Sequence, residues 1–168
     1  FETFAISTVT RGKAGIGGDF RIEGNTLLTG ITSLNNLTSV GGRIEITGND
    51  ALTSLDGLDS LTTVGGLIIN SNDLIATLQP LNNLTTVDGD LEIHSTPLIS
   101  SLSGLDSLTT VGGHFSIYQN YDLTSLSGAD SLSSIGDYIN FGNNYDLCQS
   151  KVDSFVARLV SFGWSEDL

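Results

Sequence analysis

The chain has 168 residues, of which 39% are hydrophobic and 15% are charged, and it carries a formal net charge of -13 with a sequence pI near 4.1. This length predicts one domain with enough apolar residues for a core of its own. The acidic charge argues against nucleic acid and anionic membrane surfaces as partners, because both are bound through Lys and Arg.

Composition predicts an extracellular protein. The chain has 20 glycines, 2 prolines, no methionine and many Ser, Thr, Asn and Leu residues, a mixture typical of an extracellular β-rich surface. No apolar run approaches the roughly 18 residues needed to span a bilayer, so no membrane insertion by this segment is expected. A chain that begins at Phe1, without methionine or an export signal, is expected to be a piece of a secreted or surface-attached protein. Its single Cys148 cannot form an internal disulfide.

The chain divides into a short leading segment and a long repetitive one. Residues 1–15 contain an alternating apolar stretch, which predicts an N-terminal cap or extension. Residues 16–147 repeat, and the motif Leu-Thr-Thr-Val-Gly-Gly occurs at 61–66 and 108–113. The apolar residue before the paired glycines recurs every 24 residues, with one interval of 23, at Ile16, Val40, Val64, Val87, Val111 and Ile135.

Each repeat has the pattern of a short strand followed by a coil. Two apolar residues flank a variable one, and leucines then follow at every third position. The expected strands are 20–22, 44–46, 67–69, 91–93, 115–117 and 139–141. One coil cannot bury its own leucines, so neighbouring coils must stack. The predicted fold is mainly β, a right-handed β-solenoid of about six coils with one parallel sheet.

An asparagine follows most of these strands after two further residues. The amide can satisfy backbone groups where the chain turns out of the sheet, so we predict a structural ladder and not a binding site. The fourth coil has Thr96 at this place, which predicts a local weak point. The ladder residues are Asn25, Asn49, Asn72, Asn120 and Asn144.

Residues 148–168 are expected to form a helical cap that covers the last core layer. Apolar residues from Val152 to Val160 have helical spacing. Asp146 and Gln149 stand in capping-box positions, and Gly163 is expected to end the helix.

The unit Val40-x3-Ile44-x-Ile46-x2-Asn49-x2-Leu52-x2-Leu55 resembles the receptor L-domain type of leucine-rich repeat, as found in insulin and epidermal growth factor receptors and in fungal and bacterial surface proteins. The resemblance covers about 130 residues. It implies an exported recognition module and carries over no catalytic residues. The ending at Cys148 is similar to bacterial members in which such a cysteine pairs with a later one, so this thiol is either free or paired outside the fragment.

The sequence gives little sign of catalysis, cofactors or metals. His94 and His114 lie near acidic residues without a nucleophile motif around them, and no enzymatic function is expected. Neither Cys-x2-Cys nor His-x3-His spacing is present, which argues against zinc. The run 88–90, Asp-Gly-Asp, lacks the ligand density of a calcium loop and is interpreted as a solvated turn.

A ligand-binding face is predicted on the sheet. Residues that alternate with the buried strand positions must point outward, and stacking aligns equivalent positions of neighbouring coils. Aromatic and polar side chains gather in this way towards the C-terminal half, a combination suited to a protein or carbohydrate ligand at a cell surface. The candidate residues are His94, His114, Ser116, Tyr118, Tyr138 and Asn140.

Two alternative functions remain open from the sequence. The solenoid could be the structural, self-associating tip of a surface fibre, with a second copy of the chain as its partner. Stacked hydroxyl pairs such as 62–63 and 109–110 also occur on ice-binding solenoids, but adjacent hydroxyl residues do not share one flat face, which favours a structural ladder.

Overall fold

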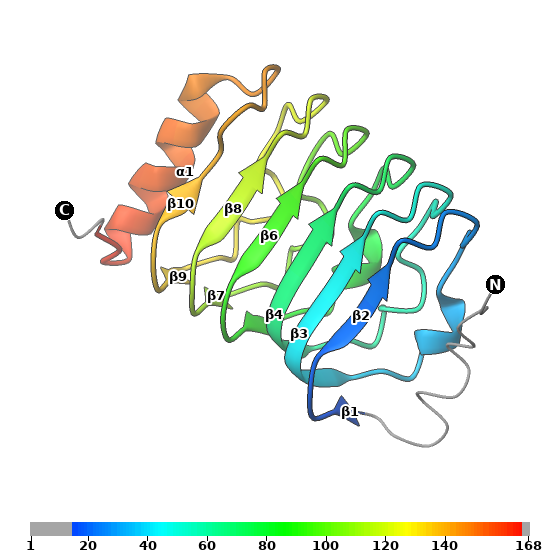
Figure 1. Cartoon of the computed structure of the whole chain (residues 1–168). Helices are drawn as coiled ribbons and strands as arrows, with labels where there is room; N and C mark the ends of the chain where they lie inside the picture. Colours follow the sequence, from blue (N-terminus) through cyan, green and yellow to red (C-terminus); the bar gives the residue numbers. More distant parts are fainter. Residues whose placement is uncertain (1–14, 166–168) are drawn as a thin grey trace.

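The computed structural model describes residues 15–165, and the predicted cap at 1–15 lies almost wholly outside them. The described chain winds into a right-handed solenoid in which all strands join one parallel sheet (Figure 1). This confirms the predicted fold class. The six strands of the main face are connected by about five turns, fewer than the six coils expected, because the chain leaves the repeat for a helix after the sixth strand.

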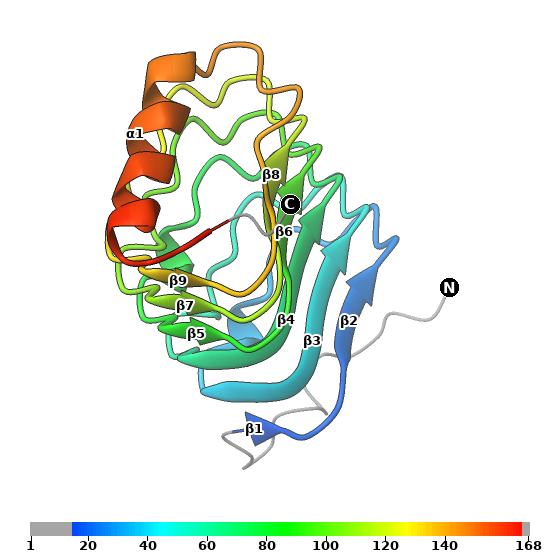
Figure 2. The same ribbon diagram turned by 90° about the vertical axis from the view of Figure 1, so that its left-hand side faces the viewer.

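Two rows of strands line adjacent sides of the solenoid (Figure 2). The main row is β2 (Phe20–Glu23), β3 (Ser39–Thr47), β4 (Thr63–Asn70), β6 (Leu91–His94), β8 (Phe115–Tyr118) and β10 (Ile139–Asn140). The second row consists of the two-residue strands β1 (Gly15–Ile16), β5 (Thr86–Val87), β7 (Thr110–Val111) and β9 (Ser134–Ile135), together with the first residues of β3 and β4. The rows meet at a corner where paired glycines stand.

Glycines stand at this corner because neighbouring coils approach closely there. A Cβ atom at Gly112 would overlap the Asp88 carbonyl of the preceding coil, and one at Gly136 would overlap the Gly112 carbonyl. The third coil is one residue shorter at this corner than the other coils. Gly66 therefore pairs with Arg43 of β3, and the register of the two strands shifts between Val40 and Arg43. Each pair of glycines therefore permits the coil spacing on which the sheet depends.

The core is a continuous column of aliphatic side chains. The strand residues and every third coil leucine, from Ile31 to Leu132, are almost completely buried. The return side contains two short 3-10 helices, η2 (Thr32–Leu34) and η3 (Gln79–Leu81), which supply further buried leucines. Each coil thus completes its burial only against its neighbours, as the repeat pattern predicts.

The asparagine side chains connect successive coils inside the turn. Asn72 is fully buried, and its Oδ1 accepts from the Asn49 backbone N–H at 3.2 Å. Its Nδ2 donates to the Ile46 carbonyl of the preceding coil and to the Asn70 carbonyl, both at 2.9 Å. Thr96 instead donates its hydroxyl within its own coil, to the His94 carbonyl at 3.2 Å.

The helix α1 (Gln149–Ser161) closes the C-terminal end of the solenoid (Figure 1). Phe155 and Leu159 are buried, and the Phe155 ring lies 5.8 Å from the Phe115 ring and 5.3 Å from the Phe141 ring between centroids. Arg158 donates hydrogen bonds to carbonyls of the last coil at Asp130, Leu132 and Ala129. No helix in the described part of the chain is long and apolar enough to cross a membrane.

The predicted capping box is wrong, whereas the predicted helix end is confirmed. The N-cap is Cys148, whose side chain makes no capping hydrogen bond, and the Gln149 amide donates forward to Asp153 at 2.8 Å. The helix begins after the last repeat leucine has been placed, which puts Asp146 in the turn before it. Gly163 has a φ of +96° directly after the C-cap, a conformation that favours glycine.

We expect Asn72→Ala to lower the free energy of unfolding by about 2 to 3 kcal/mol, because buried backbone groups of two coils lose their partners. Conversely, Thr96→Asn should raise it by about 1 kcal/mol by supplying the missing amide between coils three and four. Urea unfolding followed by circular dichroism measures both. Equal stability of all three proteins would contradict a stabilising role for the ladder.

Candidate ligand-binding site

The outward side chains of the main row form three columns, which together we call the outer face. Residues of one column are register partners in successive strands, so each lies beside its counterpart in the next coil. The central column is Arg21, Glu45, Ile68, Glu92, Ser116 and Asn140. The column before it holds Asp19, Arg43, Gly66, Asp90, His114 and Tyr138, and the column after it holds Glu23, Thr47, Asn70, His94, Tyr118 and Gly142.

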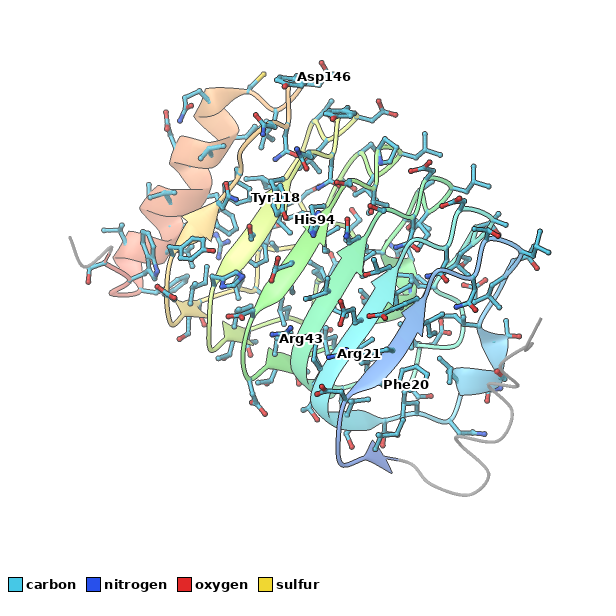
Figure 3. All side chains as sticks on the ribbon, viewed as in Figure 1. Phe20, Arg21, Arg43, His94, Tyr118 and Asp146 are labelled. Carbon is cyan, nitrogen blue, oxygen red and sulfur yellow. The ribbon has the colours of Figure 1, made fainter. Side chains whose placement is uncertain are left out.

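The N-terminal half of the outer face is charged. Arg21 lies 3.5 Å from the Asp19 carboxylate and 3.4 Å from that of Glu45. Arg43 reaches across the short third coil to Asp90, at 4.0 Å. Arg21 and Arg43 lie along the same side of the sheet as His94 and Tyr118 (Figure 3). Exposed pairs of this kind add little stability, so they chiefly define the charge of the surface.

The C-terminal half carries two histidine–tyrosine stacks. The rings of His94 and Tyr118 lie 4.3 Å apart between centroids with 10° between their planes. Those of His114 and Tyr138 lie 4.8 Å apart with 11° between planes. Each stack joins neighbouring coils in one column, because the 24-residue period places both rings in register. The structure therefore brings four of the six candidate residues together as two pairs.

The other two candidates form a hydrogen-bonded pair between the stacks. Asn140 donates its Nδ2–H to the Ser116 hydroxyl at 3.0 Å, and its Oδ1 accepts from the Gly142 backbone N–H at 2.9 Å. Ser116 is only 3% exposed and therefore lies beneath the surface. It holds the Asn140 amide in place and cannot offer a ligand much surface of its own.

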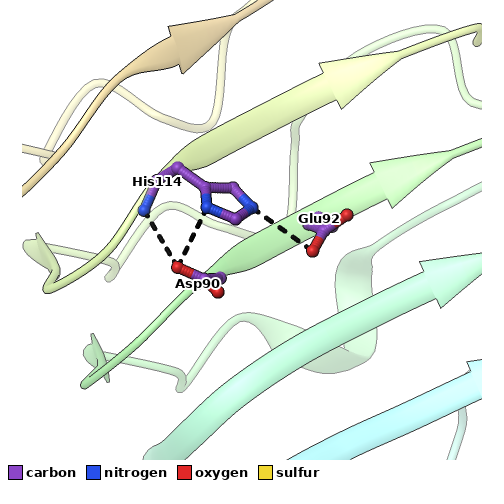
Figure 4. Close-up of side chains that lie close together, drawn as sticks. All are labelled: Asp90, Glu92 and His114. Carbon is purple, nitrogen blue, oxygen red and sulfur yellow. Dashed lines mark hydrogen bonds and ion pairs between the residues drawn. The ribbon is translucent and has the colours of Figure 1, made fainter.

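His114 lies between two carboxylates (Figure 4). Its Nδ1 is 3.0 Å from Asp90 Oδ1 and its Nε2 is 3.2 Å from Glu92 Oε1. Asp90 Oδ1 also accepts the His114 backbone N–H at 3.2 Å. Sequence reasoning did not include the two acidic residues in the site, although their column positions are readable from the repeat.

Asp90, Glu92 and His114 also form the one group in the described part of the chain that could hold a metal ion, with ligand atoms within 4.8 Å of one another. The two ring nitrogens of His114 point in opposite directions, each towards a different carboxylate. One imidazole nitrogen and both carboxylates could therefore bind a common cation only after the ring or a carboxylate turned. The present geometry is that of a histidine held between two carboxylates by its ring nitrogens.

Burial and charge shift two protonation equilibria at the stacks. Partial burial lowers the pKa of His94 below 6.5, and the nearby charge of Glu92 opposes that shift. Burial also raises the pKa of Tyr118, and the neighbouring Glu92 and Tyr138 add to the effect. At neutral pH the His94–Tyr118 stack is therefore uncharged.

One hydroxyl residue of each adjacent pair, just before the second-row strands, is hydrogen-bonded to the neighbouring coil. Thr62 Oγ1 donates to the Thr38 carbonyl and Thr85 Oγ1 to the Thr62 carbonyl, both at 3.0 Å. In the same way the Thr109 hydroxyl donates to the Thr85 carbonyl, and the Ser133 hydroxyl donates to the Thr109 carbonyl. These hydroxyls connect coils, which is the structural role that their adjacency in the sequence favours.

Sequence reasoning missed the exposed leucines of an apolar ridge along the turns that follow the main strands. Leu27, Leu74 and Leu98 are 88%, 46% and 42% exposed and stand two residues after the ladder position. Tyr121 and Tyr145 stack 5.7 Å apart, one residue after the ladder, where the ridge continues. The available signal was that leucines recur two residues after the ladder position in three coils. This edge lies outside the outer face.

A solenoid of leucine-rich coils with one exposed, rigid sheet face defines a recognition scaffold. Residues 64–157, more than half of the chain, match the family model described as the receptor L domain. The chain belongs to this family of non-enzymatic, ligand-binding modules, which confirms the resemblance seen in the sequence. No curated protein and no solved structure matches the chain.

We expect a proton NMR titration to give His94 a midpoint below pH 6.5, because burial disfavours its charged form. Glu92→Gln should lower the midpoint further by removing a charge that favours the imidazolium. A lowered pKa in the folded protein means that His94 binds a proton more readily in the unfolded chain. Protonation of His94 therefore lowers the free energy of unfolding as the pH falls below 6.5. A midpoint above 6.5 would contradict the described burial.

Proposed function

We propose that the chain is a non-enzymatic recognition or adhesion module that acts outside the cell or at its surface and binds a protein or carbohydrate ligand. The binding surface is the C-terminal half of the outer face. The observation that carries this proposal is the pair of histidine–tyrosine stacks, set on either side of the hydrogen-bonded Asn140 amide.

The rigidity of the outer face supports this role. Its side chains stand on paired strands, and the rings and the Asn140 amide are held by one another. Little conformational entropy is therefore lost when a ligand binds. Tyrosine offers a large surface with a polar tip, and such residues carry much of the binding energy at recognition surfaces.

Family and charge support an extracellular setting. The receptor L domain is a ligand-binding module of receptors, and the net charge of -13 keeps an exposed solenoid soluble while discouraging binding to anionic polymers. The partner at a cell surface is then expected to be neutral or basic. This excludes nucleic acid from the proposal.

The contacts of the histidines support the absence of catalysis. His114 has a carboxylate beside each ring nitrogen, which leaves neither nitrogen facing a hydroxyl nucleophile. His94 Nδ1 lies 3.4 Å from the Ser95 hydroxyl, but that hydroxyl donates to Gln119 Oε1 of the next coil. A nucleophile needs a base that receives its proton, and neither histidine is placed for that.

The proposal is tested with two matched double variants. Tyr118→Ala with Tyr138→Ala removes the tyrosines of the outer face, whereas Tyr121→Ala with Tyr145→Ala removes a stacked pair on the turn edge. Each protein, fluorescently labelled, is incubated with intact cells and with isolated cell-wall polysaccharide. We expect saturable binding by the wild type, at least tenfold weaker binding by the outer-face variant, and unchanged binding by the turn-edge variant.

Circular dichroism and thermal melting verify that both variants keep the fold. The proposal fails if the outer-face variant binds as well as the wild type. It also fails if sedimentation shows that the wild type only associates with itself through this face, since the chain would then be a structural, self-assembling element.

A further inference from the structure

The His94–Tyr118 stack ends abruptly at Gly142. His94 and Tyr118 are register partners, and the Ser95 N–H donates to the Tyr118 carbonyl. In the next coil the Gln119 N–H donates to the Gly142 carbonyl in the same manner, at 3.0 Å. Gly142 therefore occupies the place in the sixth coil that Tyr118 occupies in the fifth.

One face of the Tyr118 ring is consequently left without a stacking partner. The parallel rings of this stack follow each other from coil to coil, so His94 covers the side of Tyr118 that faces the fourth coil. The opposite side faces the sixth coil, where Gly142 has no side chain. Within the described residues no further ring stacks on Tyr118. Figure 3 shows His94 and Tyr118 side by side on neighbouring strands of the outer face.

The backbone does not require glycine at position 142. Gly142 does not have a positive φ. A Cβ atom placed on it would meet only Asn140 Oδ1 within 4 Å, at 3.1 Å. The corner residue Gly136 differs, because a side chain there would overlap the preceding coil. The consequence of the glycine at 142 is therefore an open space beside an aromatic ring.

The groups around this space are polar and fixed in position. Asn140 presents its amide between Ser116 and the Gly142 N–H, with both hydrogen bonds close to 3 Å. A flat ring beside a fixed amide matches a pyranose, whose C–H face packs on an aromatic ring while its hydroxyls form hydrogen bonds. Beyond these two hydrogen bonds the Asn140 amide keeps one Nδ2–H and one Oδ1 lone pair, which a sugar hydroxyl can use and an apolar protein side chain cannot.

We propose that the open face of Tyr118 above Gly142 is a subsite for one neutral pyranose ring. The inference rests on the proposed function and names the ligand class for that face. Glu92, Asp90 and the net charge of -13 disfavour acidic sugars such as sialic or uronic acids. Asn140 is the hydrogen-bonding residue of the subsite, and Tyr118 is its stacking platform.

The test uses a glycan array that contains neutral, amino and acidic oligosaccharides, followed by titration of the strongest neutral binder. Gly142→Phe extends the stack by one ring and fills the space, whereas the Tyr121→Ala, Tyr145→Ala variant changes only the turn edge. We expect the wild type to retain neutral pyranose glycans, Gly142→Phe to bind them at least tenfold more weakly, and the turn-edge variant to stay within about threefold of the wild type. Thermal melting checks the fold of each variant.

The outcomes separate the subsite from the proposed function. Glycan binding that survives Gly142→Phe but is lost in the Tyr118→Ala, Tyr138→Ala variant overturns the subsite and leaves the recognition face standing. Binding confined to acidic glycans overturns the neutral-sugar assignment. An array without signal from the folded wild type overturns the sugar subsite, and the cell-binding comparison of the double variants then decides the proposed function independently.

Discussion

Burial of the coil leucines by neighbouring coils is the interaction on which the rest of this structure depends. A single turn of about 24 residues presents its leucines to the interior but has nothing of its own to cover them. Stacking in register solves this and creates the parallel sheet, the glycine corner and the buried turn. Buried turns bring polar backbone groups into the core, and the amides of residues such as Asn72 satisfy those groups across the coil boundary.

The same register determines the chemistry of the surface. Because equivalent positions of neighbouring coils lie side by side, two aromatic residues one period apart become a stack, as His94 and Tyr118 do. An acidic residue and a histidine one period apart come into contact, as Asp90 and His114 do at 3.0 Å. Each residue of the outer face therefore contacts its counterparts in the neighbouring coils. The N-terminal half of this face is charged, and the aromatic half begins at the fourth coil.

Ends and interruptions of the repeat are the places where this regularity fails. Thr96 interrupts the ladder, the third coil lacks one residue, and α1 replaces the next coil by inserting Phe155 against the last core layer. Gly142 interrupts a column on the surface without any demand from the backbone. Interruptions in the core weaken packing, whereas an interruption on an exposed column opens space for a ligand, which gives this surface position a functional interpretation.

The sequence by itself determined the solenoid, its core, the outward columns and the helical cap, because a strict period converts position in the chain directly into position in space. It could not determine what each side chain does within its column. Ser116 is placed on the outer face by its period, yet it is almost fully buried and accepts a hydrogen bond from the Asn140 amide. His114 occupies its expected place, but only the tertiary structure decided that both its ring nitrogens face carboxylates, because rotamers and the start of α1 depend on packing between coils and not on the pattern within one.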